Sequence, residues 1–180
     1  MKEKTTTSLL PYMHPDGIEA GCDEAGRGCL AGPVYAAAVI LDTQNTDKEL
    51  LEKLDDSKKL TEKKREALFD IIKEKAVAYA IAEASPAEID EINILNASML
   101  AMRRAILGLE PAADFALIDG NTVKNIPIPA IGVVKGDAVQ NGAGCVQVVL
   151  GEIAADPGEL LGIFPGIAAL TLPITALGVG

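Results

Sequence analysis

The sequence predicts an α/β or α+β domain built on a single sheet, and three observations support this. Short apolar runs bounded by glycine and proline are typical of buried strands. Two other segments place apolar residues at helical spacing, with charges on the opposite face. Strands and helices then alternate along the 180 residues in an order that suits one sheet flanked by helices.

The individual elements follow from these patterns. Strands are predicted at residues 18–23, 34–41, 77–84, 115–119 and 131–134. Amphipathic helices are predicted at 61–75 and 97–109. A further helix is expected to start at Ser85, because Pro86 follows it and Glu88 completes a capping box. Residues 42–56 are predicted as a charged loop with a short helix, and residues 1–16 as a polar lead-in.

Carboxylates follow two of these strands where each one ends. Asp23 and Glu24 come directly after an apolar run, and Asp119 ends another. If the two strands are parallel neighbours, Asp23 and Asp119 lie side by side at one sheet edge, where ligands of α/β proteins bind. Buried charges need a partner, and oxygen ligands select hard cations. We therefore expect Asp23, Glu24 and Asp119 to bind Mg²⁺ or Mn²⁺.

The residues after Glu24 suggest an anion beside that cation. Glycine lets backbone N–H groups approach a phosphate, and arginine offers a fork of donors. Metal-dependent chemistry on a phosphodiester is thus predicted. The phosphate and substrate contacts expected from the residue types are Gly26, Arg27, Gly28, Ser57, Lys58 and Lys59. Each motif alone also fits an ordinary solvated turn, with Thr61 as a helix cap.

Other polar and aromatic residues receive simpler interpretations. Asn93 and Asn96 are expected to act as cap or turn residues, and Tyr35 and Tyr79 as packing residues within strands. His14, the only histidine, lies in a polar segment and is not expected to act in catalysis.

Charge and cysteine content limit the classes of protein. The net charge of −10 argues against a nucleic-acid coat protein, but not against a nuclease whose acids hold metal. Three cysteines without C-x-x-C spacing fit a reducing compartment. No secretory signal is visible. Residues 160–180 carry no charge and are long enough to span a membrane, but Pro165 and Pro173 disfavour a spanning helix. We therefore expect a buried or disordered tail. The alternative is a tail-anchored membrane protein.

Five motifs in order make the chain closely resemble bacterial type 2 ribonuclease H (ribonuclease HII) over residues 18–138. The motifs are Gly21–Gly28 with Ala31–Val34, Asp56–Leu60, Ile92–Ser98, Leu117–Asn121 and Lys135–Ala138. The resemblance implies a ribonuclease H-like fold, a mixed sheet flanked by helices. It implies a cytoplasmic monomer without membrane contact, acting on RNA–DNA hybrids and on duplex DNA that contains ribonucleotides.

The resemblance also implies residue roles. Asp23, Glu24 and Asp119 would be the catalytic carboxylates that hold Mn²⁺ or Mg²⁺ for two-metal hydrolysis to a 5′-phosphate product. One ion would activate a water and the other would stabilise the leaving 3′-oxygen. Gly26, Arg27 and Gly28 would contact the ribonucleotide and its 2′-hydroxyl.

The end of the chain departs from the family pattern. The family carries a fourth carboxylate, a substrate-sensing tyrosine and basic helices beyond this point, whereas this chain has no tyrosine and no basic residue after Lys135. Asp156 falls near the position of the fourth carboxylate, but its neighbours do not match. We therefore divide the chain into a catalytic core, 1–138, and an atypical apolar tail, 139–180. The alternative function is a catalytically impaired hybrid-binding or inert variant.

Overall fold

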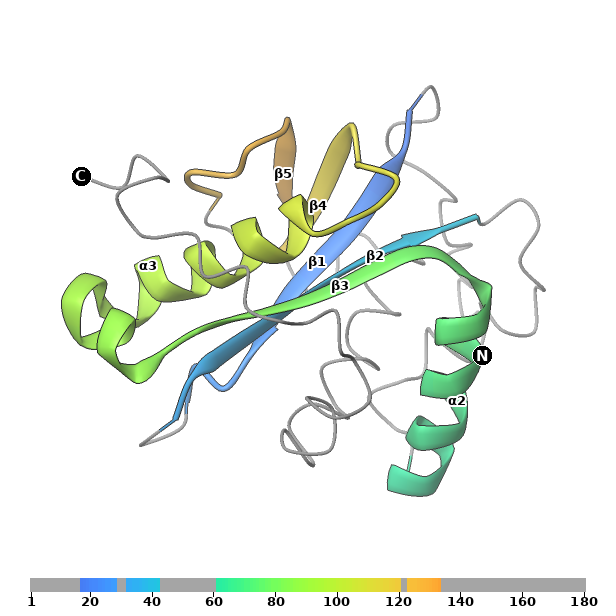
Figure 1. Ribbon diagram of the computed structural model, residues 1–180, viewed down its shortest axis with the longest axis horizontal. Helices are drawn as coiled ribbons and strands as arrows, with labels where there is room; N and C mark the ends of the chain where they lie inside the picture. The colour runs from blue at the N-terminus through green and yellow to red at the C-terminus, as the bar shows by residue number, and fades with distance from the viewer. Residues whose placement is uncertain (1–16, 29–31, 43–60, 121–122, 134–180) are drawn as a thin grey trace, which may run out of the picture.

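The computed structural model describes residues 17–28, 32–42, 61–120 and 123–133, which form one mixed sheet and two helices (Figure 1). The elements are β1 (Glu19–Ala25), β2 (Val34–Leu41), α2 (Glu62–Lys75), β3 (Ala76–Ala84), α3 (Pro86–Leu107), β4 (Phe115–Asp119) and β5 (Ala130–Val133). The strand order is β3-β2-β1-β4-β5. Strand β2 is antiparallel to β1 and β3, whereas β4 is parallel to β1 and β5. The predicted fold class is confirmed.

One face of the sheet packs against α3. Alternate residues of each strand point to this face, because strand side chains have a period of two. Cys22, Ala36, Ala82 and Ile118 join Met102 of α3 in one buried cluster. Most strand residues in this cluster are alanines, so α3 can approach the sheet closely. Figure 1 shows α3 running along the central strands.

Helix α3 begins where the sequence predicts but is longer than expected. Ser85 accepts a hydrogen bond from the Glu88 backbone N–H at 3.3 Å, and the Glu88 carboxylate accepts one from the Ser85 N–H at 2.8 Å. The two helical segments of α3 meet at Asn93, whose φ of +66° and ψ of 162° are not helical, so both predicted helices are present. The Asn93 side chain accepts hydrogen bonds from the N–H groups of Leu95 and Asn96, both at 3.1 Å. The cap role predicted for Asn93 is confirmed.

Other boundaries differ slightly from the predictions. Strand β1 runs through Glu24 to Ala25, because pairing with β2 continues to Ala25↔Tyr35. The two adjacent acids are therefore strand residues and do not follow the strand. Helix α3 ends at Leu107, and Thr61 precedes α2 without a capping hydrogen bond from its side chain.

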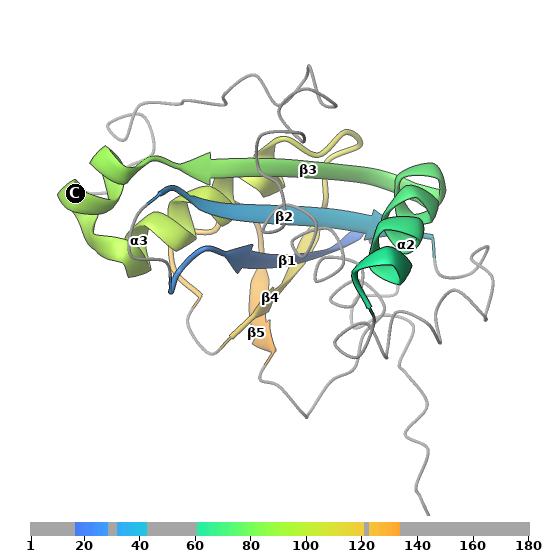
Figure 2. The ribbon, with the colours of Figure 1, turned by 90° about the horizontal axis from the view of Figure 1, so that it is seen from below.

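Four strands end at the same edge of the sheet. Because β2 is antiparallel to both of its neighbours, β1 and β3 run in the same direction, as do β4 and β5. In Figure 2 the arrowheads of β1 and β3 point away from α2, which lies at the opposite end of these strands. The carboxyl ends of β1, β3, β4 and β5 thus share one edge.

Several predicted features lie outside the described residues. These are the loop at 42–56 beyond Asp42, the segment with Ser57, Lys58 and Lys59, the lead-in with His14, and the tail at 139–180 with Asp156. Within the described ranges, neither helix is long and apolar enough to cross a membrane.

Candidate functional site

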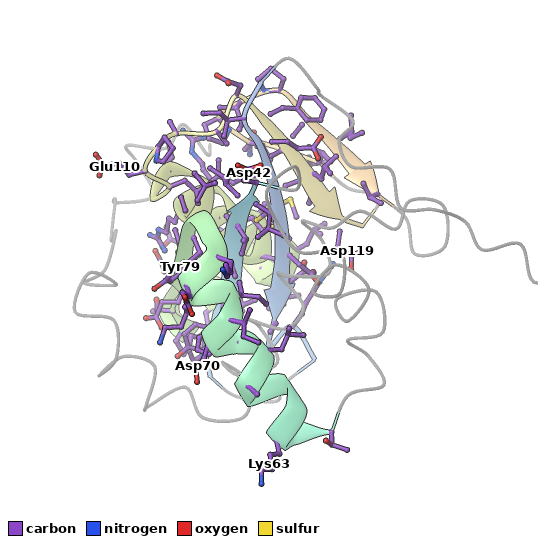
Figure 3. The ribbon with its side chains drawn as sticks, turned by 90° about the vertical axis from the view of Figure 1, so that its right-hand side faces the viewer. Asp42, Lys63, Asp70, Tyr79, Glu110 and Asp119 are labelled. Atoms are coloured by element: carbon purple, nitrogen blue, oxygen red, sulfur yellow. The ribbon has the colours of Figure 1, made fainter. Side chains whose placement is uncertain are left out.

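The parallel pairing of β1 with β4 brings together two carboxylates that are 96 residues apart in the sequence. The register reaches Cys22↔Ile118, so the next residues along the two strands are Asp23 and Asp119. Both lie on the sheet face away from α3, because Cys22 and Ile118 point toward it. Figure 3 labels Asp119 across the central strands from α3. The predicted juxtaposition of Asp23 and Asp119 is confirmed.

Asp23 is under electrostatic strain in this position. Burial, followed by the negative charge of Asp119, raises the pKa of Asp23 from 3.8 to about 7. The charge of Glu24 raises this pKa further. The Glu24 backbone N–H donates a hydrogen bond to Asp23 Oδ1 at 2.7 Å and opposes the rise only in part. A positive charge at this point would relieve the repulsion.

Glu24 has one satisfied and one unsatisfied oxygen. Its Oε1 accepts a hydrogen bond from Arg27 Nη1 at 3.0 Å. The Glu24 side chain is 12% exposed. Its Oε2 is buried and has no hydrogen-bond partner among the described residues. A buried carboxylate oxygen without a partner is costly, so this atom is open to a ligand that the described residues do not supply.

The turn after Glu24 requires glycine at its first position. Gly26 has a φ of +91°, and a Cβ there would lie 3.0 Å from the Pro33 carbonyl oxygen. Any other residue would be strained and crowded. Gly120 follows Asp119 with a φ of +121°, and its N–H donates to the Val133 carbonyl at 2.9 Å. These two turns fix the backbone next to each acidic strand end.

The three acids match the chemistry of a divalent cation in part. Oxygen-only donors, the unpaired Glu24 Oε2 and the repulsion on Asp23 all fit a hard metal ion. Yet no group of three or more Asp, Glu, His or Cys side chains in the described ranges has a geometry ready to hold a metal. The acids gather at one edge without forming a closed ligand shell, and their roles as ligands stay predictions.

Sequence reasoning did not identify a buried ion pair near this edge. Arg104 is 2% exposed and donates from Nη2 to Glu88 Oε1 at 2.7 Å and from Nη1 to the Glu83 carbonyl at 2.8 Å. It ties the two halves of α3 together across the kink and holds the end of β3. A spacing of sixteen residues across a kink leaves no periodic signal, so only the fold reveals the pair.

Comparison with solved structures identifies the fold. Ribonuclease HII of Archaeoglobus fulgidus, solved in a complex with PCNA, superposes with a TM-score of 0.63 at 24% identity, covering 88% of this chain and 85% of that one. Ribonuclease H2 of Pyrococcus horikoshii gives a TM-score of 0.62 at 24% identity, covering 82% and 77%. A ribonuclease HIII (Bst-RNase HIII) solved with Mn²⁺ gives 0.60 at 15% identity, covering 83% and 56%. The chain therefore has the ribonuclease H-like fold.

Sequence comparison identifies the family within that fold. The ribonuclease HII family model matches residues 20–137. Ribonuclease HII of Bacteroides thetaiotaomicron is 58% identical over 132 residues, which cover 72% of this chain and 63% of that protein. The protein of Verminephrobacter eiseniae is 53% identical over 137 residues, covering 76% and 63%. The chain belongs to the ribonuclease HII family, and it spans less than two thirds of the length of these curated relatives.

Proposed function

We propose that the core of this protein, residues 1–138, is the catalytic part of a metal-dependent endonuclease. Its substrates would be the RNA strand of RNA–DNA hybrids and single ribonucleotides embedded in duplex DNA, in the cytoplasm. The observation that carries the proposal is the pairing of Asp23 with Asp119 at the edge where the Gly26 turn begins, in a chain of the ribonuclease HII family.

The roles of the residues follow from their positions. Asp23 and Asp119 would bind Mg²⁺ or Mn²⁺ from one face, and Glu24 would contribute its unpaired Oε2. When bound, the ions supply positive charge that favours attack of water on the phosphodiester and departure of the 3′-oxygen, which leaves a 5′-phosphate. Arg27 is half-exposed beside Glu24 and would bind the ribonucleotide with the glycines of its turn. We further propose that Ser57, Lys58 and Lys59 bind phosphates.

The composition of the tail favours a second candidate, an impaired or purely hybrid-binding variant. All sixteen Lys and Arg residues lie at or before position 135, whereas Glu152, Asp156 and Glu159 follow. Phosphate contacts by basic residues supply much of the affinity for a duplex. A tail without them would weaken substrate binding by the same core.

A cleavage assay separates the two candidates. The full chain is incubated with a hybrid duplex and with a duplex carrying one ribonucleotide, in Mn²⁺ or Mg²⁺, beside a chimera with a family-like end after Ala138. We expect slow or absent cleavage by the chain itself and strong cleavage by the chimera, which Asp23→Asn and Asp119→Asn abolish. Efficient cleavage by the original chain that requires Asp156 would contradict our view of the tail. A chimera that is inert with either metal would contradict the proposed function.

A further inference from the structure

Tyr35 of β2 lies on the same sheet face as the paired acids, although the sequence marks it only as a strand residue. Tyr35 pairs with Ala25 of β1 and with Glu83 of β3, and the next row pairs Ala37 with Asp23. Directly paired residues, and residues two apart on one strand, share a face. Tyr35 is therefore one row nearer than Asp23 to the turn at Gly26.

The ring of Tyr35 is held by its neighbour on β3. Burial raises the pKa of the Tyr35 phenol, and the charge of Glu83 and its hydrogen bond with the phenol raise it further. The backbone of β3 at Glu83 is fixed, since the Glu83 carbonyl accepts the 2.8 Å hydrogen bond from the buried Arg104 on the other side of the sheet. The phenol hydroxyl is thus directed toward β3, while part of the ring stays exposed.

We propose that Tyr35 is a substrate-contact residue whose ring supports a nucleotide of the strand bound at the Gly26–Gly28 turn, with Glu83 as its positioning residue. This inference rests on the function proposed above. Aromatic rings bind bases and sugars of any sequence by stacking, which suits an enzyme that reads sugar chemistry. The acidic Glu83 would repel a phosphate, so we expect the Tyr35 ring to contact the base or sugar and Arg27 to contact the phosphate.

Tyr79 of β3 provides a matched control within the same sheet. It pairs with Val39, so it lies one row beyond Ala37, on the side away from the Gly26 turn, and two rows from Tyr35. Strand alternation gives it the same face as Tyr35. Burial raises its pKa as well. A purely structural role for strand tyrosines would make the two residues respond alike, whereas a substrate contact would single out Tyr35.

The test uses the full chain labelled with 3-fluorotyrosine. The sequence contains three tyrosines, Tyr12, Tyr35 and Tyr79, so ¹⁹F spectra should hold three signals that single Tyr→Phe variants assign. On addition of a hybrid duplex with Ca²⁺, we expect the Tyr35 signal to shift and the Tyr79 signal to stay in place. Equal shifts of both signals, or no shift of the Tyr35 signal when the duplex is bound, would overturn the proposal.

Binding measurements give a second, independent outcome. We expect Tyr35→Ala to raise the duplex Kd about tenfold, as for loss of one stacked base, and Tyr35→Phe to raise it less than about threefold because the ring remains. Tyr79→Ala should leave the Kd unchanged. If Tyr35→Ala fails to fold, Tyr35→Leu keeps apolar volume without an aromatic face. Wild-type Kd in either Tyr35→Ala or Tyr35→Leu refutes the inference alone. If the tail prevents binding by the wild-type chain, the same variants are measured in the chimera of the cleavage assay, and a chimera that binds no duplex refutes the proposed function and this inference with it.

Discussion

Replacing Asp23 by asparagine should make the protein more stable when no divalent metal is present. The side chain keeps its shape but loses the charge that Asp119 and burial oppose. In the unfolded chain the carboxyl loses its proton near pH 3.8, whereas in the folded protein it does so near pH 7. Folded Asp23 therefore holds its proton more tightly, and its ionisation removes stability as the pH rises between these two values.

The size of the effect follows from the shift. A change from 3.8 to about 7 in pKa corresponds to about 4 kcal/mol once both states are ionised. For a chain of this size that equals a rise in Tm on the order of 10 °C for Asp23→Asn at pH 8. Near pH 4 the wild-type carboxyl is protonated in the folded state, and the two proteins should melt together.

Thermal melts at pH 4 and pH 8, with and without Mn²⁺, measure this directly. Wild type should gain stability from Mn²⁺ at pH 8 by mass action, and Asp23→Asn should gain far less. Asp70→Asn, which removes an exposed acid on α2, is the control and should behave like wild type. Identical melting of wild type and Asp23→Asn at pH 8, with no response of either to Mn²⁺, would refute both the repulsion and the role as ligand.

Substitutions at three further positions test other parts of the structure. Arg27→Ala should reduce the binding preference for a duplex with one ribonucleotide over an all-DNA duplex about tenfold, because one charge-assisted hydrogen bond is lost. The affinity for Mn²⁺ should change little. An unchanged preference would contradict the role of Arg27. Arg104→Met should lower the free energy of unfolding in urea by about 3 kcal/mol, because it leaves Glu88 without its buried partner. Hydrogen bonding to Arg104 lowers the pKa of Glu88 to about 2, so the wild-type advantage should be full above pH 4.5 and shrink as the pH falls from 4.5 through 2. An advantage independent of pH would contradict this. Asn93→Ala should cost about 1–2 kcal/mol through its positive φ and lost cap, and Asn93→Gly clearly less, and equal losses would argue against backbone strain.

Local signals in the sequence predicted the elements well. The apolar runs predicted both ends of β2 and of β4 correctly, and the capping box at Ser85 predicted the start of α3. Both signals depend on neighbours within a few residues. The same patterns predicted two helices, and α3 contains two helical segments that are separated at Asn93, whose φ and ψ are not helical. Here it caps the second segment, and Arg104 holds both parts together.

The part of the candidate site that could be predicted is the part that depends only on which strands are neighbours. Apolar strands ending in acids suggested that Asp23 and Asp119 meet, and this required only that β1 and β4 be parallel neighbours. The surroundings of Tyr35 depend instead on the register between three strands, to which no sequence motif points. Glu24 is a similar case, since its ion pair with Arg27 follows from spacing, whereas the burial of its second oxygen does not.

The distribution of charge at this edge argues that the acids are there for a ligand. A fold selected only for stability would not place Asp23 beside Asp119 in a buried setting, since their repulsion costs free energy at neutral pH. Elsewhere in the described core the one buried arginine, Arg104, has its countercharge on Glu88. Among the described residues, buried charge is therefore neutralised within α3, whereas no described cation compensates the repulsion between Asp23 and Asp119 on β1 and β4. A cation from solution would complete the second arrangement in the same way that Glu88 completes the first.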